Sequence, residues 1–325
     1  MLKVVGRDEV RRLLRYKDCI RVVRSAMSDL SAGKTNQMLR RITPIRGRNV
    51  LSVMAGVMAP EIGFGAKVIS VFPENAKLGR QSHQGVVILF DAATGEPVCT
   101  LHAGEITRIR TAAASAVATD ALANVDASSL AVLGCGEQGL AHVEAISHVR
   151  TLRSVRVWAR SHDAARRAAS ELSGSLNLPV EAAKSVQEAV RDAHIVCTTT
   201  AAVDPLLMGE WLNEGTHINL VGSSDGGSAE VDSTLVVRAR IFADHREGVL
   251  QQGGEYLRAH AEGLVDENHI LGEIGDVLNG SMKGRWSSRE ITAYKSLGHI
   301  VQDVASARYV YDRVQEVGGG SDVVF

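Results

Sequence analysis

The sequence predicts an α/β protein in which a Rossmann-type, doubly wound parallel sheet is joined to a second α+β domain. Three observations predict this class. A glycine-rich turn near residue 134 separates a buried apolar run from a helical pattern, and apolar runs then alternate with helical patterns to about residue 243. Before that turn, short β-like runs follow one another without helices between them. A chain of 325 residues is long enough for two such domains.

The glycine-rich turn is the strongest local signal. Ser129–Leu133 is typical of a strand buried on both faces, and Gly134, Gly136 and Gly139 follow it in G-x-G-x-x-G spacing. In dinucleotide-binding units the first glycine allows the tight turn and the second lets the backbone approach a pyrophosphate. The third lets the helix pack closely on the sheet, and the helix N-terminus offers N–H groups to the phosphates. With a second apolar run at Val155–Trp158, the stretch predicts a dinucleotide site.

The end of the second strand indicates which cofactor binds. NAD sites usually place Asp or Glu there, to accept a hydrogen bond from the ribose 2′-hydroxyl. Here Arg160 and Ser161 precede the first acid, Asp163. A guanidinium and a hydroxyl suit a 2′-phosphate better than a 2′-hydroxyl. The sequence therefore favours NADP(H), and NAD(H) is the alternative if Arg160 is only a solvated strand-end arginine.

The elements before the glycine-rich turn predict an antiparallel or mixed sheet. Helical periodicity covers residues 8–32 and ends at Gly33, and an alanine-rich helix over 105–123 carries the chain into the nucleotide-binding part. Between these helices, turn residues separate four β-like runs, at 41–45, 49–55, 65–71 and 85–90.

Beyond the glycine-rich turn, strands and helices alternate. The pattern predicts helices over 163–172 and 185–192, strands over 195–199, 217–221 and 239–243, and a final long helix from about 288 to 315 that returns to the first domain. Ligands of a parallel sheet bind at the carboxyl ends of its strands. The cofactor contacts expected there are Thr198, Thr199, Val221, Gly222 and Ser223. Lys295 and Ser296 interrupt the final helical pattern, so they either contact the nicotinamide end of the cofactor or break the helix.

Composition argues against several classes of protein. The net charge of −1 gives no reason to expect a nucleic-acid partner, and no run of about eighteen apolar residues indicates a membrane span. The first residues lack the apolar core of a signal peptide. The four cysteines are scattered without metal-ligand spacing, so no metal site is expected. They predict reduced, buried thiols in a cytoplasmic protein.

Two cationic residues and a histidine of the first domain are candidates for substrate chemistry. Lys67 interrupts an apolar stretch. Burial among other cations would lower its pKa and suit proton transfer, although alternation in a half-exposed strand explains it as well. Arg110 either clamps a carboxylate or lies on a helix surface, and His83 either contacts a substrate or is satisfied by backbone. With the dinucleotide site, these residues indicate an NAD(P)-dependent oxidoreductase of a small anionic substrate.

Eight phrases, in order along nearly the whole chain, resemble the ornithine cyclodeaminase/mu-crystallin family. SHQ before an apolar strand and YKSLG look most similar to its ketimine reductase (Δ1-pyrroline-2-carboxylate reductase) branch. The eight phrases are RRITP (40–44), GAKVIS (65–70), SHQGVVILFD (82–91), EITRIRTAAASA (105–116), VLGCGEQGLAH (132–142), HINLVGSSD (217–225), GEIGDVLNG (272–280) and YKSLGHIVQD (294–303).

The resemblance implies a homodimer with two domains. Residues 1–115, completed by a C-terminal helix at about 300–325, would bind the substrate and form the dimer interface. Residues 116–299 would bind the nucleotide. The family's phosphate-loop residues fall on Gly134, Gly136, Glu137 and Gln138, with Thr111 nearby. The pair Arg160–Ser161 resembles that of NADP-using members.

The resemblance also implies roles for the cationic residues. The family's carboxylate-binding arginine falls on Arg40, with Arg41 as the close competitor. Its active-site lysine falls on Lys67 and its second arginine on Arg110, and His83 lies among the residues expected to bind the substrate.

One departure from the family pattern bears on the reaction. Cyclodeaminases have an aspartate in the loop after the VG pair, where this chain has Ser224, with Asp225 one place later. Asp225 is a candidate acid or base, and an Asx turn in a glycine-rich loop is the alternative. The displacement argues against cyclodeamination of ornithine. We expect reduction of a cyclic α-imino acid, Δ1-pyrroline-2-carboxylate or Δ1-piperideine-2-carboxylate, to proline or pipecolate. The alternatives are ornithine cyclodeaminase, an alanine dehydrogenase-like enzyme and a nucleotide-binding protein without turnover.

Overall fold

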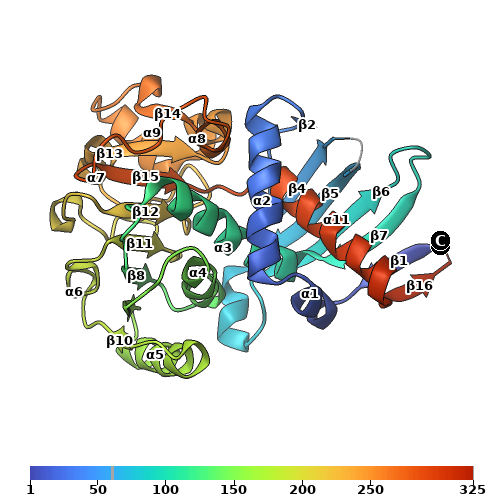
Figure 1. The fold of residues 1–325 in the computed structure, drawn as a ribbon, viewed down its shortest axis with the longest axis horizontal. Coiled ribbons are helices and arrows are strands. Elements are labelled where there is room, and N and C mark those ends of the chain that lie inside the picture. Colours follow the sequence, from blue (N-terminus) through green and yellow to red (C-terminus); the bar gives the residue numbers. More distant parts are fainter. Residues whose placement is uncertain (60–61, 325) are drawn as a thin grey trace. The chain divides into compact units, whose positions relative to one another are not determined.

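The computed structural model describes residues 1–59 and 62–324. The chain forms two compact units (Figure 1). The first unit is Met1–Arg110 with His299–Phe325, and the second is Thr111–Gly298. The boundary between them falls inside helix α3 (Ala103–Leu122).

The first unit contains a mixed sheet, which confirms the sequence prediction. Its strands lie in the order β16-β1-β7-β6-β5-β4-β2, and β3 also pairs with β4. Every pairing is antiparallel except that of β1 with β7. The strands are β1 (Leu2–Val5), β2 (Asn36–Gln37), β3 (Arg41–Arg46), β4 (Asn49–Val57), β5 (Phe64–Val71), β6 (His83–Phe90), β7 (Pro97–His102) and β16 (Ser321–Val323).

One face of this sheet is covered by helices. Helix α11 (Ile300–Val317) packs on β4, β5 and β6, and α2 (Tyr16–Ser31) packs on α11 (Figure 1). The close approach depends on Gly56, where an added Cβ would lie 2.8 Å from Ile300 Cγ2. The single helix predicted over 8–32 is wrong in one respect. It is broken at Leu14 and Arg15 into α1 (Arg7–Leu13) and α2. The apolar periodicity does not reveal this, because Leu13 and Tyr16 are buried on either side of the break and Leu14 is buried within it.

The second unit contains a parallel sheet in the order β10-β9-β8-β11-β12-β15-β13-β14, with every pairing parallel. Its first five strands follow the order of a Rossmann fold, so the predicted fold class is confirmed. The strands are β8 (Ser129–Leu133), β9 (Ser154–Trp158), β10 (Val180–Ala182), β11 (Ile195–Thr198), β12 (His217–Leu220), β13 (Ala239–Ala243), β14 (Ile270–Glu273) and β15 (Ile291–Lys295). The helices are α4 (Glu137–Ser147), α5 (His162–Leu176), α6 (Val186–Val190), α7 (Ser233–Arg238), α8 (Arg246–Gln252), α9 (Gly254–Ala261) and α10 (Ile274–Leu278), together with most of α3.

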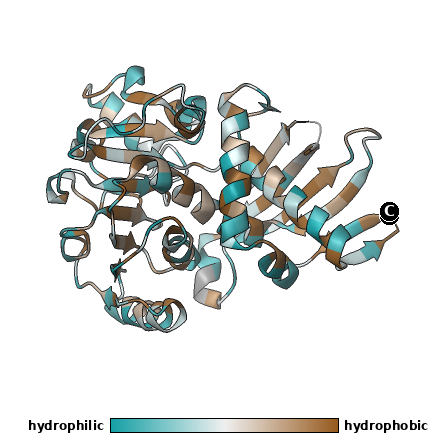
Figure 2. Ribbon diagram, in the orientation of Figure 1, coloured by the Kyte–Doolittle hydropathy of each residue, from teal (hydrophilic) through white to brown (hydrophobic). Residues whose placement is uncertain are grey.

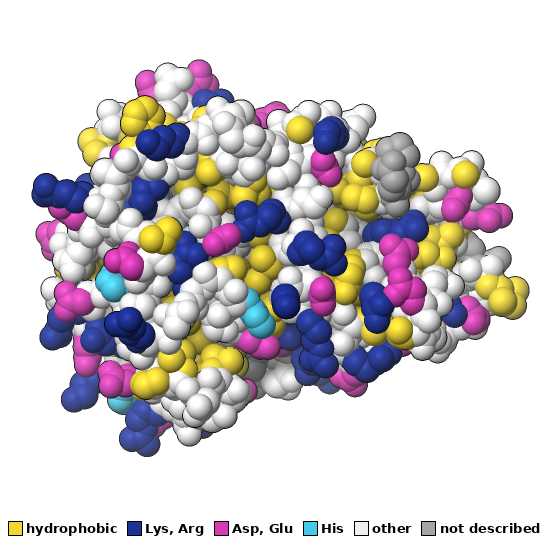
Figure 3. Space-filling view, in the orientation of Figure 1, with side chains coloured by type: hydrophobic (Ala, Val, Ile, Leu, Met, Phe, Trp, Pro, Cys, Tyr) yellow, Lys and Arg dark blue, Asp and Glu magenta, His cyan; other side chains and the backbone are white. Residues whose placement is uncertain are grey.

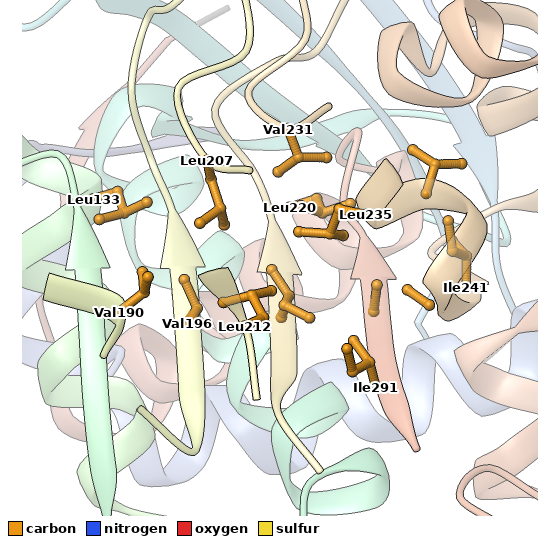
Figure 4. Packing of buried hydrophobic residues seen from close by; sticks show 14 of the residues in the cluster. Leu133, Val190, Val196, Leu207, Leu212, Leu220, Val231, Leu235, Ile241 and Ile291 are labelled. Carbon is orange, nitrogen blue, oxygen red and sulfur yellow. The ribbon is translucent and has the colours of Figure 1, made fainter. Parts of the chain in front are cut away.

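The core of the second unit lies against the middle of its sheet. Leu133, Val196 and Leu220 come from three neighbouring strands, β8, β11 and β12, and pack with Leu207 and Val190 (Figure 4). The strands of both sheets carry mostly hydrophobic colours in Figure 2, as expected for strands covered on at least one face.

The long helix predicted from about 288 to 315 is wrong before Ile300. Ile291–Lys295 is β15, which pairs with β12 on one side and β13 on the other. All five of its residues are buried, so the run ITAYK lacks the alternation of a half-buried strand and cannot be told from a buried helix by periodicity. Gly298 follows at φ +84°, and the helix itself begins at Ile300.

The four cysteines are free, and Cys135 is half-buried where burial was predicted. Within the described ranges, no helix has the length and apolarity to cross a bilayer, and no cluster of His, Cys, Asp and Glu could hold a metal ion. On the face seen in Figure 3, Lys and Arg side chains are interspersed with Asp and Glu, in keeping with the near-zero net charge.

Candidate active site

A buried ionic cluster lies on the helix-covered face of the first unit's sheet. Lys67 stands in β5 opposite Met54 of β4 and Val87 of β6, and its side chain is only 3% exposed. Its Nζ lies 2.6 Å from Oδ2 of Asp303, which belongs to the first turns of α11. It also lies 3.5 Å from Oγ1 of Thr107 in α3. The lysine is therefore buried and paired, and the alternative of a half-exposed strand lysine is wrong.

Arg110 joins the same carboxylate from α3. Its Nε donates to Oδ1 of Asp303 at 2.9 Å, and its Nη1 donates to Oε1 of Gln302 at 2.7 Å. Arg110 is 4% exposed and Asp303 is fully buried, so Arg110 does not lie on a helix surface. One aspartate thus holds both the lysine and the arginine that sequence analysis had singled out. We call Lys67, Arg110 and Asp303 the ionic triad.

The surroundings shift the pKa of two groups in this region. Burial, followed by the nearby Arg110, lowers the pKa of Lys67 to about 7, although Asp303 acts in the opposite direction. Burial, followed by the charges of Lys67, Arg110 and Arg40, lowers the pKa of His83 to about 4. His83 is therefore neutral at neutral pH, and its Nδ1 hydrogen-bonds with Ser82 Oγ at 2.9 Å. The structure brings these four predicted residues into one region.

The strand register separates Arg40 from Arg41. Arg41 pairs with Val53, which pairs in turn with Val68 on the sheet face that points away from α11. Arg41 is exposed on that face. Side chains alternate along a strand, so the preceding residue, Arg40, is directed to the side of Lys67, as its effect on the Lys67 pKa also indicates.

Sequence analysis did not single out Asp303, Gln302 or Thr107. The phrase YKSLGHIVQD contained two of them without a role. Asp303 lies in the helical run Ile300–Ala307, in which every residue is buried. A buried charge is rarely left without a partner, so this aspartate in an otherwise mostly apolar run was the signal that could have indicated a buried ion pair.

The glycine-rich loop of the second unit fits a dinucleotide pyrophosphate. Gly134 has φ +112°, and an added Cβ would lie 2.7 Å from the carbonyl oxygen of Thr199. A Cβ on Gly139 would collide with the carbonyl oxygen of Gly134. A Cβ on Gly136 meets nothing within 4 Å, so that position faces open space. Gly136 is the N-cap of α4 without a side-chain cap, which leaves N–H groups for a phosphate.

Two of the residues predicted to contact the cofactor have a buried polar atom without a hydrogen-bond partner in the described part of the chain. The atoms are Oε1 of Gln138 and Oγ of Ser296. Buried polar groups are normally satisfied. A bound cofactor fits such donors and acceptors. Glu137 opens α4 beside Gln138, and Thr111 is buried in α3.

Glu230, which sequence analysis missed, ties together the ends of β11 and β12. Its carboxylate accepts hydrogen bonds from Thr198 Oγ1 at 2.6 Å, from Thr200 N at 2.6 Å and from Gly222 N at 2.7 Å. Burial raises the pKa of this carboxyl, although its hydroxyl and amide donors act against that shift. Thr199 hydrogen-bonds to the carbonyl oxygens of Leu133 and Gly134 instead. The strand-end threonines therefore shape the loops around the glycine turn.

Lys295 is held inside the second unit by protein groups. Its Nζ lies 2.7 Å from the carbonyl oxygen of Ser223, 2.7 Å from Ser223 Oγ and 2.7 Å from Glu255 Oε2. Ser223 Oγ also hydrogen-bonds to Glu255. Burial raises the pKa of the Glu255 carboxyl, but Lys295 outweighs it and the pKa lies below its usual range. Val221 and Gly222 directly precede this network at the end of β12.

The remaining predicted residues are exposed. Arg160 and Ser161 follow β9, and Ser161 Oγ caps α5 by accepting a hydrogen bond from Ala164 N at 3.3 Å. Asp225 Oδ1 accepts a hydrogen bond from Gly227 N at 2.9 Å, which is an Asx turn. The carboxylate of Asp225 is thus engaged in its own loop, and its role as an acid or base stays a prediction.

The chain is similar in sequence and in fold to proteins of known family. The ornithine cyclodeaminase/mu-crystallin family matches residues 2–318. A Δ1-pyrroline-2-carboxylate reductase of Bacillus cereus is 34% identical over 99% of each chain. The solved Δ1-pyrroline-2-carboxylate reductase of Thermococcus litoralis, in complex with NADH and L-proline, has a TM-score of 0.96 at 32% identity, covering 99% of this chain and 100% of its own. An archaeal alanine dehydrogenase dimer with bound NAD has a TM-score of 0.94 at 27% identity, covering 100% and 99%.

Proposed function

Because the chain belongs to the ornithine cyclodeaminase/mu-crystallin family, we propose that it reduces cyclic ketimine carboxylates with NAD(P)H. The substrates are Δ1-pyrroline-2-carboxylate and Δ1-piperideine-2-carboxylate, and the products are L-proline and L-pipecolate. The observation that carries the proposal is the ionic triad, a buried lysine with a pKa of about 7 held beside an arginine. Such a pair suits a small molecule that has a carboxylate next to a nitrogen that must be protonated.

The protein residues do the positioning and the proton transfer. Arg110 and Arg40 bind the substrate carboxylate, which fixes the adjacent C=N bond, and such positioning is worth roughly 7–11 kcal/mol in favourable cases. Lys67 donates its proton to the imine nitrogen, because an iminium carbon is the better hydride acceptor. Reduced nicotinamide, when bound, supplies the hydride to that carbon. His83 is neutral and adds a hydrogen-bonding group without a further positive charge.

The second unit holds the cofactor in this proposal. Gly134 makes the turn at φ +112°, Gly136 leaves space for the pyrophosphate, and the N–H groups at the N-terminus of α4 donate to it. The unpartnered Oε1 of Gln138 accepts from a hydroxyl or amide of the cofactor. We favour NADP(H) over NAD(H) because the exposed Arg160 stands where an NAD site has an acid. Ser161 is less suited to contact the 2′-phosphate than the sequence suggests, since its hydroxyl already caps α5.

The first unit also provides the dimer interface in this proposal. On the sheet face away from α11, Val53, Val68 and Val86 form a cross-strand row and are 41%, 38% and 45% exposed. Phe64 and Phe90 stack at 5.2 Å in the same sheet. Contiguous apolar surface of this kind on a sheet usually marks a protein interface. We propose that a second copy of the chain covers it.

Sedimentation velocity tests the dimer. The protein should sediment at twice the mass of the chain, and Val68→Lys should shift it to the monomer. Leu78→Lys, a change of another exposed apolar residue of the first unit outside the strands, should leave the dimer intact. A monomeric wild type would contradict this part of the proposal. The four free cysteines favour a reducing compartment, and we propose the cytoplasm.

A substrate panel tests the reaction itself. Oxidation of NADPH and NADH is followed with both cyclic imines, with pyruvate plus ammonia, and with ornithine alone. We expect turnover with the cyclic imines. Turnover with pyruvate and ammonia would instead identify an alanine dehydrogenase, and proline plus ammonia formed from ornithine without net cofactor oxidation would identify a cyclodeaminase. Cofactor binding without any turnover would identify a binding protein.

A further inference from the structure

Asp303 is the acidic member of the ionic triad, and its position is fixed by the way α11 packs. It accepts from Lys67 Nζ at 2.6 Å on one oxygen and from Arg110 Nε at 2.9 Å on the other. Helix α11 comes close to β5 at Gly65, two residues before Lys67, where an added Cβ would lie 3.3 Å from Val304 Cγ2. The packing of α11 on β5 therefore places the carboxylate of Asp303 beside Lys67, where it is fully buried.

The contacts of Arg110 leave one nitrogen for a ligand. Nε donates to Asp303 and Nη1 donates to Gln302. Gln302 is itself fixed, because its Nε2 lies 3.2 Å from Met27 Sδ of α2. Nη2 of Arg110 donates to none of the described residues. Two nitrogens of the Arg110 guanidinium, Nε and Nη1, are thus held by residues of α11, and Nη2 is left to bind a ligand.

The charged and titratable groups around Lys67 come from every element that packs on it. Arg110 is in α3, Asp303 in α11, His83 in β6, and Arg40 precedes β3. Cys19 of α2 lies near Arg110 and Asp303, and burial raises its pKa to about 12, so it is neutral. Asp303 is therefore the one anion in this set that acts on Lys67. Arg110 and Arg40 are cations that oppose the ammonium, and His83 and Cys19 are neutral.

We propose that Asp303 is a positioning residue of the reductase: it holds Lys67 and Arg110 in a fixed geometry and keeps Lys67 in the protonated form that the reduction consumes. The inference rests on the proposed function. In the reaction, the proton leaves the Lys67 ammonium for the imine nitrogen and the hydride of NAD(P)H adds to the imine carbon. The products are the amino acid, the neutral lysine and NAD(P)+, and solvent then restores the proton.

The experiment measures the ionisation of Lys67 without using activity. Protein with ¹³C at the lysine ε-carbon is titrated by NMR, and the Lys67 signal is assigned by its loss in Lys67→Arg. We expect a midpoint near pH 7 in the wild type. Asp303→Asn should lower that midpoint by about one to three pH units, because it removes the neighbouring anion. Arg110→Gln, a second variant that keeps the test open if the first does not fold, should raise the midpoint. Asp312→Asn, an exposed carboxylate of the same helix, should leave it unchanged.

The same variants separate this inference from the proposed function. The alkaline limb of kcat/KM for the cyclic imine should move to lower pH in Asp303→Asn by the same amount as the NMR midpoint, and KM should rise because Arg110 is no longer held. A Lys67 midpoint that does not move in Asp303→Asn, or that lies near 10 in the wild type, would overturn the inference. If the midpoints shift as expected but no cyclic imine is reduced, the role of Asp303 stands and the proposed function fails.

Discussion

The glycine-rich loop of the second unit and the ionic triad of the first unit are built from different materials. The loop uses mainly backbone, since Gly134, Gly136 and Gly139 lie within six residues, and the position of an added Cβ would meet main-chain atoms and the Thr199 hydroxyl, or open space. The triad uses charged side chains, and Lys67 and Asp303 lie 236 residues apart in the chain. A site built from backbone is encoded by a contiguous motif, and its affinity for a ligand does not depend on the protonation of a side chain. A site built from charged side chains depends on packing between distant segments, and in the ionic triad Lys67 titrates near neutral pH.

The largest effect is expected when the triad loses its proton donor. Lys67→Met should lower kcat by roughly 10²–10⁴-fold, the usual contribution of a positioned acid or base. Cofactor affinity, measured by quenching of protein fluorescence, should stay within twofold, because the loop is untouched. Lys34→Met, at an exposed lysine of the same unit, is the control. Activity of Lys67→Met within threefold of the wild type would contradict the role of the lysine.

The pH dependence should distinguish the two sites. With the Lys67 pKa at about 7, kcat/KM should fall about tenfold per pH unit above that value, because the ammonium is the reactive form. Cofactor affinity should stay nearly constant from pH 7 to 9. The same lysine binds fewer protons in the folded state than in the unfolded state between about pH 7 and 10.5, so its contribution to the free energy of unfolding rises through that window. A flat kcat/KM over pH 7–9 would show that no triad group is the acid.

Alanine substitutions in the loop should separate binding from stability. Gly136→Ala places a methyl group in open space, so Tm should be unchanged while the cofactor Kd rises at least about tenfold, or 1.4 kcal/mol. Gly139→Ala forces the methyl group against Gly134, so it should cost about 1–3 kcal/mol of stability. Gly174→Ala, in α5 with nothing near its Cβ, is the control for helix propensity. Equal Tm values for the Gly136 and Gly139 variants would mean that the loop is not packed as described.

The smallest effect concerns cofactor choice. Arg160→Asp should lower the ratio of kcat/KM for NADPH to that for NADH by about tenfold, the scale of one charge-assisted hydrogen bond. Arg166→Asp, at an exposed arginine in the neighbouring helix α5, should leave the ratio unchanged. If Arg160→Asp leaves the ratio as it is in the wild type, NADP preference has another source or does not exist.

The division between local patterns and long-range contacts also separates the parts of the fold that the sequence predicts from those that it does not. The Rossmann order and the strand Ser129–Leu133 were predictable because a buried parallel strand and its glycine turn are local patterns. β15 was missed because a run buried on both faces has the hydropathy of a buried helix. β1, β7 and the helices α7 to α10 were missed because tertiary pairing and packing define them more than their own pattern does, whereas α6 lies within the helix predicted over 185–192.

In the candidate site, too, residues in local motifs could be predicted and their partners from distant elements could not. Lys67 and Arg110 were found by motif, but their common partner Asp303 was not, since nothing local links positions in β5, α3 and α11. Glu230 and Glu255 were missed for the same reason, because each is a buried carboxylate whose partners come from elements distant in the sequence. The register directs Arg41 to the face away from α11 and Arg40 to the side of Lys67, which the sequence pattern alone does not indicate, and the role of Arg40 stays a prediction.

The most direct test of the account follows the hydride. Protein is incubated with Δ1-pyrroline-2-carboxylate and NADPH that carries deuterium at both positions of nicotinamide C4, and the proline formed is analysed by mass spectrometry. The account predicts one deuterium at C2 of proline for each cofactor oxidised, and loss of this product in Lys67→Met. Proline without deuterium, or labelled cofactor left unconsumed while ornithine yields proline and ammonia, would contradict it.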